Sequence, residues 1–277
     1  MKLSRFSPYY TPKVDINRNV YVSLGVMAFV IFLLVWSILS YSQLINPALL
    51  PTPGLVFNKA IQMFASGELY QHIGYSVFRV FAGFLLASLI AVPLGILMGT
   101  LKVFEGFFEP FIGFIRYMPA SAFIPLFILW IGLGEAEKIA VIFFGTFFQQ
   151  TLMIMDITKN VSNDLIDVSY TLGASRKAVF RKVILPASLP GIVDTLRITF
   201  GWAWTYLIVA EIVGSTVGLG YMIMQANRFL STDKIFVGII TIGLLGMISD
   251  FLFKLLYRKM FPYLREGGSS TSGTSSY

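Results

Sequence analysis

Six long apolar stretches constrain the fold of this chain more than any other feature of its sequence. They cover residues 21–44, 76–98, 111–133, 138–155, 192–213 and 235–257. A transmembrane helix needs about 20 mainly apolar residues, because the hydrocarbon core of a bilayer is about 30 Å thick and a helix rises about 1.5 Å per residue. The sequence therefore predicts an all-α membrane protein with about six transmembrane helices.

The composition supports a membrane protein and excludes several other classes. Hydrophobic residues make up 56% of the chain and charged residues 13%, whereas soluble domains contain about 45–50% apolar and about 25% charged residues. The absence of cysteine excludes disulfide frameworks, thiolate metal sites and cysteine nucleophiles. The single histidine, His72, excludes most histidine-based catalytic sets and metal sites. We therefore expect no catalytic residue, no metal site and no cofactor site in this chain.

The distribution of lysine and arginine predicts the orientation of the chain, since cytoplasmic loops carry an excess of both residues. With both termini in the cytoplasm, 14 of the 21 fall on the inner side, four on the outer side, and three within or beside the apolar stretches. This predicts a cytoplasmic tail over residues 1–20, one transmembrane domain over 21–257 and a second cytoplasmic tail over 258–277. The Gly- and Ser-rich end after residue 265 is predicted to be disordered. The same bias accounts for the net charge of +7 without a nucleic-acid partner.

The longest predicted cytoplasmic connection, residues 156–191, contains two short helical patterns on either side of a glycine. Residues 162–164 are good N-cap residues for the first pattern. The residues of this pattern that share one helical face are Leu165, Val168, Ser169 and Leu172. Gly173 is predicted to end the first helix with a positive φ, Ser175 to cap a second short helix, and Pro186 to terminate it. The segment therefore predicts two short helices that meet at a glycine corner at the membrane surface.

The spacing of this segment resembles the EAA loop of ABC-importer permeases. In that motif Glu-Ala-Ala is followed by three residues, Gly, nine residues, Ile, one residue and Leu-Pro, and this chain has Gly173, Leu185 and Pro186 at the matching positions. The motif positions that differ here are occupied by Asp167, Val168, Ser169 and Val183. The stretches that narrow the resemblance to the nitrate/sulfonate/taurine-type permeases are 50–53, 76–84, 93–95, 124–135, 210–214 and 218–221.

The resemblance implies the type I fold of ABC-importer permeases, an inner-membrane location and a function as the transmembrane subunit of an ATP-driven importer. The glycine corner would dock on a separate cytoplasmic ATPase, which would hold ATP and Mg. The residues assigned to this coupling are Leu165, Asp167, Leu172, Gly173, Ala174, Arg176, Lys177, Val179, Arg181, Leu185 and Pro186. The resemblance also implies a homodimer that forms the pathway at its two-fold interface, and a solute-binding protein received by the outer segments 45–75 and 215–231. The implied solute is a small anion of the nitrate, sulfonate, taurine or bicarbonate class.

Three alternatives to this function stay open. The first is a permease of the same family for a vitamin precursor. The second is a secondary transporter that works alone, although such proteins normally have more spans or inverted repeats. The third is a membrane-embedded enzyme, which needs clustered carboxylates or histidines that this sequence lacks. The sequence also lacks the G-x-x-x-x-G-K-[ST] motif of a P-loop, so we expect that the chain is not an enzyme and that a partner subunit hydrolyses ATP.

Polar residues inside the apolar stretches are candidates for the solute pathway, because an ionisable group at the bilayer centre costs about 2.5–3.5 kcal/mol and should face protein or water. Arg116 can attract anions, or it can extend to the inner headgroups, which is the favoured alternative. Pro119 breaks helical hydrogen bonding in the third stretch, which is tolerated where the backbone lines a cavity. Gln149 and Gln150 can bind a solute or bridge helices. Glu211 is included in the pathway set, although a carboxylate repels an anion and a bracing role is favoured.

Other charged residues are expected near the helix ends. Arg79 is expected at the outer interface and Arg197 at the inner one. Asp250 is expected to pair with Lys254 one helical turn later.

Overall fold

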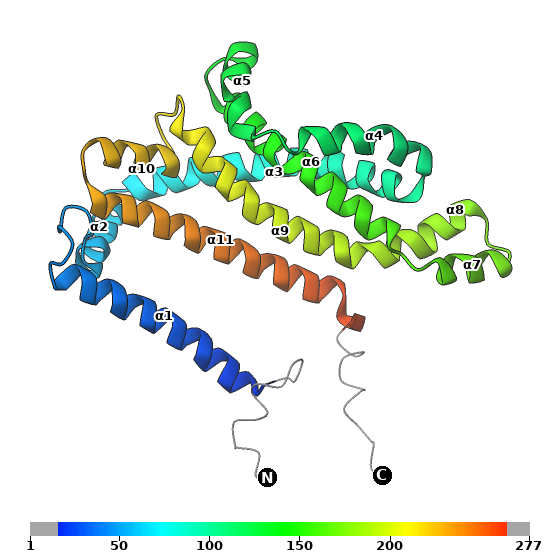
Figure 1. Cartoon of the computed structure of the whole chain (residues 1–277), viewed down its shortest axis with the longest axis horizontal. Helices are drawn as coiled ribbons and strands as arrows, with labels where there is room; N and C mark the ends of the chain where they lie inside the picture. Colours follow the sequence, from blue (N-terminus) through cyan, green and yellow to red (C-terminus); the bar gives the residue numbers. More distant parts are fainter. Residues whose placement is uncertain (1–15, 265–277) are drawn as a thin grey trace, which may run out of the picture.

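The computed structural model describes residues 16–264, which form helices and contain no strand. The predicted first tail overlaps them only at its end, and the predicted disordered segment after residue 265 lies outside them. Within this part of the chain, the helices long and apolar enough to cross a membrane are α1 (Arg18–Tyr41), α3 (Glu68–Thr100), α6 (Glu135–Lys159), a continuous helical segment over residues 176–212, and α11 (Thr232–Met260). Figure 1 shows α9 and α11 running side by side as long helices, while α1 lies near α2 (Pro53–Ala65) at its C-terminal end and diverges from α11.

The third predicted stretch, residues 111–133, is broken and forms two helical pieces instead of one straight span. α4 (Lys102–Ile115) ends shortly before Pro119, and η2 (Ala120–Phe123) then leads into α5 (Ile124–Ile131). The two pieces are bent by 84° relative to each other. The bend follows from Pro119, which has no N–H for a helical bond and keeps the residue before it out of the α region. The described chain thus has five helices long and apolar enough to cross a membrane, or up to six if the bent pair is one span.

The core of the bundle is formed by α3, α6 and α9 (Leu185–Ile212). Three glycines let α3 lie directly against α6, since a Cβ added at Gly83, Gly95 or Gly99 would be 2.8 Å or less from an atom of α6. Small residues allow helices in membranes to approach closely in this way. The buried side chains of one cluster across these helices are Val80, Phe84, Ile142, Phe200, Ala203, Trp204 and Leu207. This packing makes α3, α6 and α9 one unit that carries the polar groups described below.

Short helices lie at both ends of the bundle. α2 (Pro53–Ala65) and α10 (Leu219–Arg228) lie at one end in Figure 1, and α7 (Asn163–Thr171) and α8 (Arg176–Val179) lie at the opposite end. This separation agrees with the predicted topology, in which the first two face one side of the membrane and the last two face the other.

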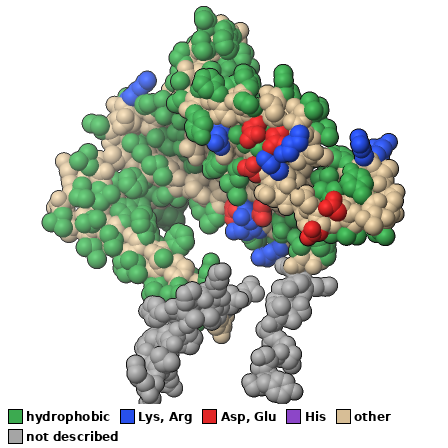
Figure 2. All heavy atoms as spheres, turned by 45° about the vertical axis from the view of Figure 1, so that its right-hand side comes forward, with side chains coloured by type: hydrophobic (Ala, Val, Ile, Leu, Met, Phe, Trp, Pro, Cys, Tyr) green, Lys and Arg blue, Asp and Glu red, His purple; other side chains and the backbone are tan. Residues whose placement is uncertain are grey.

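The surface of the bundle is strongly apolar. In Figure 2 hydrophobic side chains cover much of the visible face, and charged side chains gather in a few places. Phe29 on α1 is 71% exposed and Met247 on α11 is 58% exposed. Soluble proteins rarely expose large contiguous apolar patches, so this surface fits contact with lipid.

Candidate functional site

A cavity of about 460 Å³ lies between the end of α4, α6 and α9. Its polar lining residues are Arg116, Gln149, Trp202, Thr205 and Tyr206, and its apolar wall includes Phe144 and Phe148. Two residues predicted for the pathway, Arg116 and Gln149, therefore come together here from different helices. Arg116 is the only charged residue of the lining, so the cavity favours anions over cations.

Arg116 is positioned by the end of α4. Its backbone N–H bonds to the Ile112 carbonyl at 3.0 Å. Its guanidinium lies 4.8 Å from the centre of the Tyr117 ring, and Nη2 donates to the Tyr117 hydroxyl at 2.9 Å. No carboxylate within residues 16–264 forms an ion pair with it. The guanidinium therefore keeps hydrogen-bond donors available for a solute.

The other residues predicted for the pathway do not line this cavity. Gln150 is fully buried, and its Nε2 donates to Ser88 Oγ of α3 at 2.9 Å, so it bridges two helices. Pro119 belongs to the turn beside the cavity without contributing to its lining. Glu211 is fully buried near the far end of α9.

Nine of the eleven lining residues were not among the sequence-based pathway candidates. They are Ile115, Met118, Ala120, Phe144, Gly145, Phe148, Trp202, Thr205 and Tyr206. A signal for three of them was present, since residues 202, 205 and 206 are spaced i, i+3 and i+4 and so share one helical face. Aromatic residues at that spacing are common in any buried helix, and the pattern alone did not separate cavity from core.

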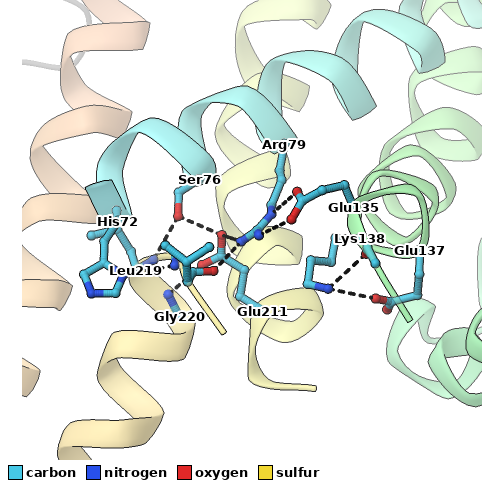
Figure 3. A network of polar contacts seen from close by, with 12 residues as sticks. His72, Ser76, Arg79, Glu135, Glu137, Lys138, Glu211, Leu219 and Gly220 are labelled. Atoms are coloured by element: carbon cyan, nitrogen blue, oxygen red, sulfur yellow. Dashed lines mark hydrogen bonds and ion pairs between the residues drawn. The ribbon is translucent and has the colours of Figure 1, made fainter. Parts of the chain in front are cut away.

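A buried ion-pair network joins α3, α6 and α9 at the end of the bundle that carries α10 (Figure 3). Arg79 of α3 is 1% exposed, and it donates to the two oxygens of Glu135 at 2.5 and 2.6 Å. It also donates to Glu211 Oε1 and to the Val217 carbonyl, both at 2.7 Å. Arg79 thus lies inside the protein and not at an exposed interface, because two carboxylates compensate its charge. The contacts of Glu211 agree with a bracing role.

The same network holds the start of α10. Three successive backbone N–H groups there bond to side chains, Gly218 to His72 Nδ1 at 3.0 Å, Leu219 to Ser76 Oγ at 2.9 Å and Gly220 to Glu211 Oε2 at 2.7 Å. The first N–H groups of a helix lack intrahelical partners, so these side chains supply them. Gly218 has a φ of 128°, and a Cβ there would collide with Glu211 and Arg79. Residue 218 must therefore be glycine for the loop before α10 to approach this network so closely.

Glu137 and Lys138 in the first turn of α6 are buried beside this network. Lys138 Nζ donates to the Gly134 carbonyl at 3.0 Å and lies 3.5 Å from Glu137 Oε2. Glu137 Oε1 has no hydrogen-bond partner among the described residues. Within residues 16–264, no group of three or more His, Asp or Glu side chains is arranged to hold a metal ion.

Gly173 forms the predicted corner after α7. Its φ is 80°, and its N–H and that of the next residue bond to the carbonyls of residues 170 and 169 at 2.9 and 3.0 Å. These are the two bonds of a Schellman cap, and they confirm that Gly173 ends the first helix. Ser175 Oγ then accepts from the Ala178 N–H at 3.3 Å, which confirms Ser175 as the cap of the second helix.

The apolar face of α7 is uncovered, and the whole helix has no buried residue. Leu165, Val168 and Leu172 are 53%, 58% and 82% exposed. The exposed charged residues of the segment that contains α7 and the corner are Asp164, Asp167, Arg176, Lys177, Arg181 and Lys182. An apolar stripe with a charged border is typical of a docking helix.

Two expectations for the second helix are wrong. Val179 is 1% exposed, so it packs inside the chain and is not on the docking face. Pro186 does not end the helix, since it lies in the first turn of α9 and residues 176–212 are helical throughout. The reason is a π-helical turn, η3 (Phe180–Ile184), that directly precedes α9. A proline is tolerated in the first turn of a helix, and the wider π turn provides that start without interrupting the helical path.

Ion pairs also tie the helices at the end of the bundle near α7. Asp250 Oδ2 lies 2.6 Å from Lys254 Nζ, which confirms that predicted pair. Arg197 Nε lies 3.3 Å from Asp250 Oδ1, so α9 is joined to α11. Lys159, the last residue of α6, lies 2.5 Å from Glu105 of α4.

Comparison with known proteins gives a consistent result. Residues 91–262 match the family described as binding-protein-dependent transport system inner membrane component. The taurine transport system permease protein TauC of Escherichia coli K12 is 34% identical over 253 residues, which covers 90% of this chain and 91% of that protein. The putative aliphatic sulfonates transport permease protein SsuC of Bacillus subtilis 168 is 35% identical over 239 residues, covering 86% and 87%.

A more distant relative and a solved structure extend the comparison. The bicarbonate transport system permease protein CmpB of Synechocystis PCC 6803 is 29% identical over 232 residues, which covers 79% of this chain and 81% of that protein. An inward-facing structure of the MetNI methionine ABC transporter superposes with a TM-score of 0.61 at 21% identity, over 69% of this chain and 95% of the solved chain. At that identity the superposition shows the shared fold.

Proposed function

Since the chain belongs to the family of binding-protein-dependent transport system inner membrane components and is a permease of an ABC importer, we propose that its solute is a small anion, with taurine and aliphatic sulfonates favoured. The observation that carries this proposal is the cavity between α4, α6 and α9, in which Arg116 is the only charged lining residue. The taurine and sulfonate permeases support a sulfonate, and the bicarbonate permease supports the wider class of small anions.

The side chains of the cavity suit the two parts of an organic anion. The planar guanidinium of Arg116 matches the oxygens of an oxyanion, and Gln149 and Thr205 add neutral donors. The aromatic side chains Phe144 and Phe148 provide contacts for carbon atoms. A single positive charge attracts the solute without holding it too tightly for release, as conduction requires.

We further propose that the exposed face of α7 and the corner at Gly173 dock on a cytoplasmic ATPase that binds ATP and Mg. Leu165 and Leu172 would enter an apolar groove, while the exposed Arg and Lys side chains next to the corner would pair with acidic groups. The corner is held by two backbone bonds, and residues 176–212 form one helical path to the cavity. A displacement of the corner can therefore reach Thr205 as a rigid-body movement.

The remaining partners follow from the same arrangement. The permease would act as a homodimer, because Trp202 and Thr205 are exposed at the open side of the cavity and a second copy would close it. α2 and α10 would receive the solute-binding protein on the outer side. Both termini would lie in the cytoplasm, which places 14 of the 21 Lys and Arg residues on the inner side.

Labelling of one cysteine in the cavity tests its preference for anions. The chain has no native cysteine, so Thr205→Cys provides a single thiol in the purified permease–ATPase complex. The anionic 2-sulfonatoethyl methanethiosulfonate should react faster than the cationic 2-trimethylammonioethyl reagent, after each rate is divided by the rate with a free thiol.

Arg116→Gln in the same chain should reduce this preference. At a separation of about 8 Å and an effective dielectric constant of about 40, one charge contributes about 1 kcal/mol for each reagent. The ratio of anion to cation rates should therefore fall roughly 30-fold. Arg228→Gln, outside the cavity, is the matched control. A ratio that Arg116→Gln leaves unchanged would contradict the proposed anion pathway.

The side of the membrane on which the corner lies is tested with Leu172→Cys in the permease expressed without the ATPase, since Leu172 is 82% exposed in the free chain. A membrane-impermeant maleimide should label it in inside-out vesicles and not in intact cells. Labelling from the outside of intact cells would contradict both the orientation and the docking of α7 on a cytoplasmic ATPase.

A further inference from the structure

Gly145 of α6 and Tyr206 of α9 are in direct contact in the cavity wall, and both belong to the lining. A Cβ added to Gly145 would lie 2.6 Å from Cγ and Cδ2 of Tyr206 and 2.7 Å from Cδ1. Carbon atoms in favourable contact are about 3.5–4.0 Å apart. Residue 145 therefore has no room for a methyl group while the ring of Tyr206 keeps its place.

The two helices cannot relieve such a contact simply by separating. Gly191 of α9 makes a second close approach to α6, where an added Cβ would lie 2.7 Å from Cγ2 of Ile157. Tyr206 also packs against the buried cluster that includes Phe200 and Leu207. Helices in such packed interiors are held at fixed distances, so the ring must give way before the backbones do.

The direction in which the ring gives way follows from its surroundings. The atoms that a Cβ at residue 145 would meet are at the base of the Tyr206 ring, so relief requires rotation of the whole ring about χ1. Gly145 of α6 lies against the base of the ring, and the ring itself lines the cavity, which is open space beside it. Since the buried cluster that Tyr206 packs against is dense, we expect the displaced ring to move into the open cavity and narrow it.

We propose that Gly145 sets the width of the cavity through Tyr206, and so limits the size of the anion that the cavity admits. Gly145 is a positioning residue, and Tyr206 is the residue that determines specificity by touching the solute. That Gly145 sets the cavity width is argued from the contacts alone. The consequence for transport rests on the proposed function of the cavity as the solute pathway.

The test uses the Thr205→Cys chain in the purified permease–ATPase complex and two anionic thiol reagents of different size. The compact reagent is 2-sulfonatoethyl methanethiosulfonate, and the bulky one is a stilbene disulfonate maleimide. Gly145→Ala should lower the labelling rate of the bulky reagent at least tenfold and that of the compact reagent less than threefold. Adding Tyr206→Leu should restore the rate of the bulky reagent, because it removes the ring.

The matched control is Gly243→Ala on α11, where no atom lies within 4 Å of an added Cβ. It should leave both labelling rates unchanged. Tyr206→Leu alone, which keeps Gly145, should raise the rate of the bulky reagent, so the inference can be tested even if Gly145→Ala folds poorly. Equal rates in the Gly145→Ala and parent chains, or an equal loss for both reagents, would overturn the inference.

Uptake by the complete importer separates this inference from the proposed function. When Gly145→Ala slows labelling by the bulky reagent as expected, it should also reduce uptake of hexanesulfonate by a factor at least ten times larger than that for methanesulfonate. If Gly145→Ala slows labelling by the bulky reagent but leaves uptake of both sulfonates unchanged, the cavity is not the pathway. The proposed function then fails, while the role of Gly145 in cavity width stands. If Gly145→Ala does not selectively slow labelling by the bulky reagent, the inference about Gly145 fails and the assignment of the cavity as the pathway is unaffected.

Discussion

Replacement of Arg79 by methionine should destabilise the permease more than any exposed charge replacement. Arg79 is 1% exposed and donates four hydrogen bonds, two to Glu135 and one each to Glu211 and the Val217 carbonyl. Methionine retains most of the apolar volume of the arginine side chain, so the change removes charge and donors without opening a large cavity. The variant therefore isolates the electrostatic contribution of the network.

The expected loss is dominated by Glu211. The side chain of Glu135 is 43% exposed and can recover water, whereas that of Glu211 is fully buried and cannot. Removal of one partner from a buried ion pair costs about 3–5 kcal/mol, because the other charge stays buried without compensation. A change of 1 kcal/mol shifts the midpoint of thermal unfolding by about 2–4 °C for a domain of roughly this size. Arg79→Met should therefore lower the midpoint by on the order of 10 °C.

The assay is thermal unfolding of the detergent-solubilised permease, followed by the loss of the monodisperse peak in size-exclusion chromatography. Glu211→Gln in the Arg79→Met background removes the uncompensated charge and keeps an acceptor for Gly220 N–H, so it should restore at least half of the lost stability. The control is Arg228→Met, whose side chain is exposed and forms no ion pair within the described residues. A midpoint lowered by less than about 2 °C, or a double variant no more stable than Arg79→Met, would refute the argument.

Three further predictions concern the corner and the cavity. Gly173→Val should abolish ATP-driven uptake while the amount of inserted permease stays normal, because a β-branched residue at a φ of 80° costs roughly 1–2 kcal/mol or more and resists the corner; parental uptake would show that the corner is not needed. Leu172→Asp should prevent copurification with the ATPase and leave the unfolding midpoint of the permease alone within about 2 °C, since Leu172 is 82% exposed; normal copurification would argue against docking through α7. Gln149→Leu should reduce anion uptake at least tenfold, whereas Gln150→Leu should leave it within twofold, because only Gln149 lines the cavity; equal effects on uptake would exclude this division of roles.

The features that the sequence predicted well are those set by neighbours along the chain. Hydrophobic runs marked the spanning helices because each run must match the thickness of the bilayer by itself. The corner at Gly173 was predictable for a similar reason, since a positive φ and a cap at Ser175 are local properties. Local rules also predicted the break at Pro119, although the angle of the bend depends on how α5 packs against α6.

The cavity and the network escaped prediction because they join residues that are far apart in the sequence. Arg79 pairs with Glu211, 132 positions away, and no spacing rule connects two such residues. Gln149 and Gln150 look alike in the sequence, and only the rotation of α6 decides which one faces the cavity. Val179 was wrongly assigned to the docking surface because the sequence does not show which apolar residues of a short surface helix pack back onto the chain, and Val179 is one that does.

The π turn η3 has a consequence for recognition between subunits. An α-helix advances by about 100° per residue around its axis, and a π turn holds one residue more than an α turn. The direction around the axis of the spanning helix in which α8 and α7 project is therefore set by the number of residues in its turns. Deletion of one residue within 180–184 would swing α7 by more than a quarter of a revolution while its own side chains stayed the same. In the proposed docking of α7 on an ATPase, the fit would therefore depend on how the helix is wound as well as on which residues it displays.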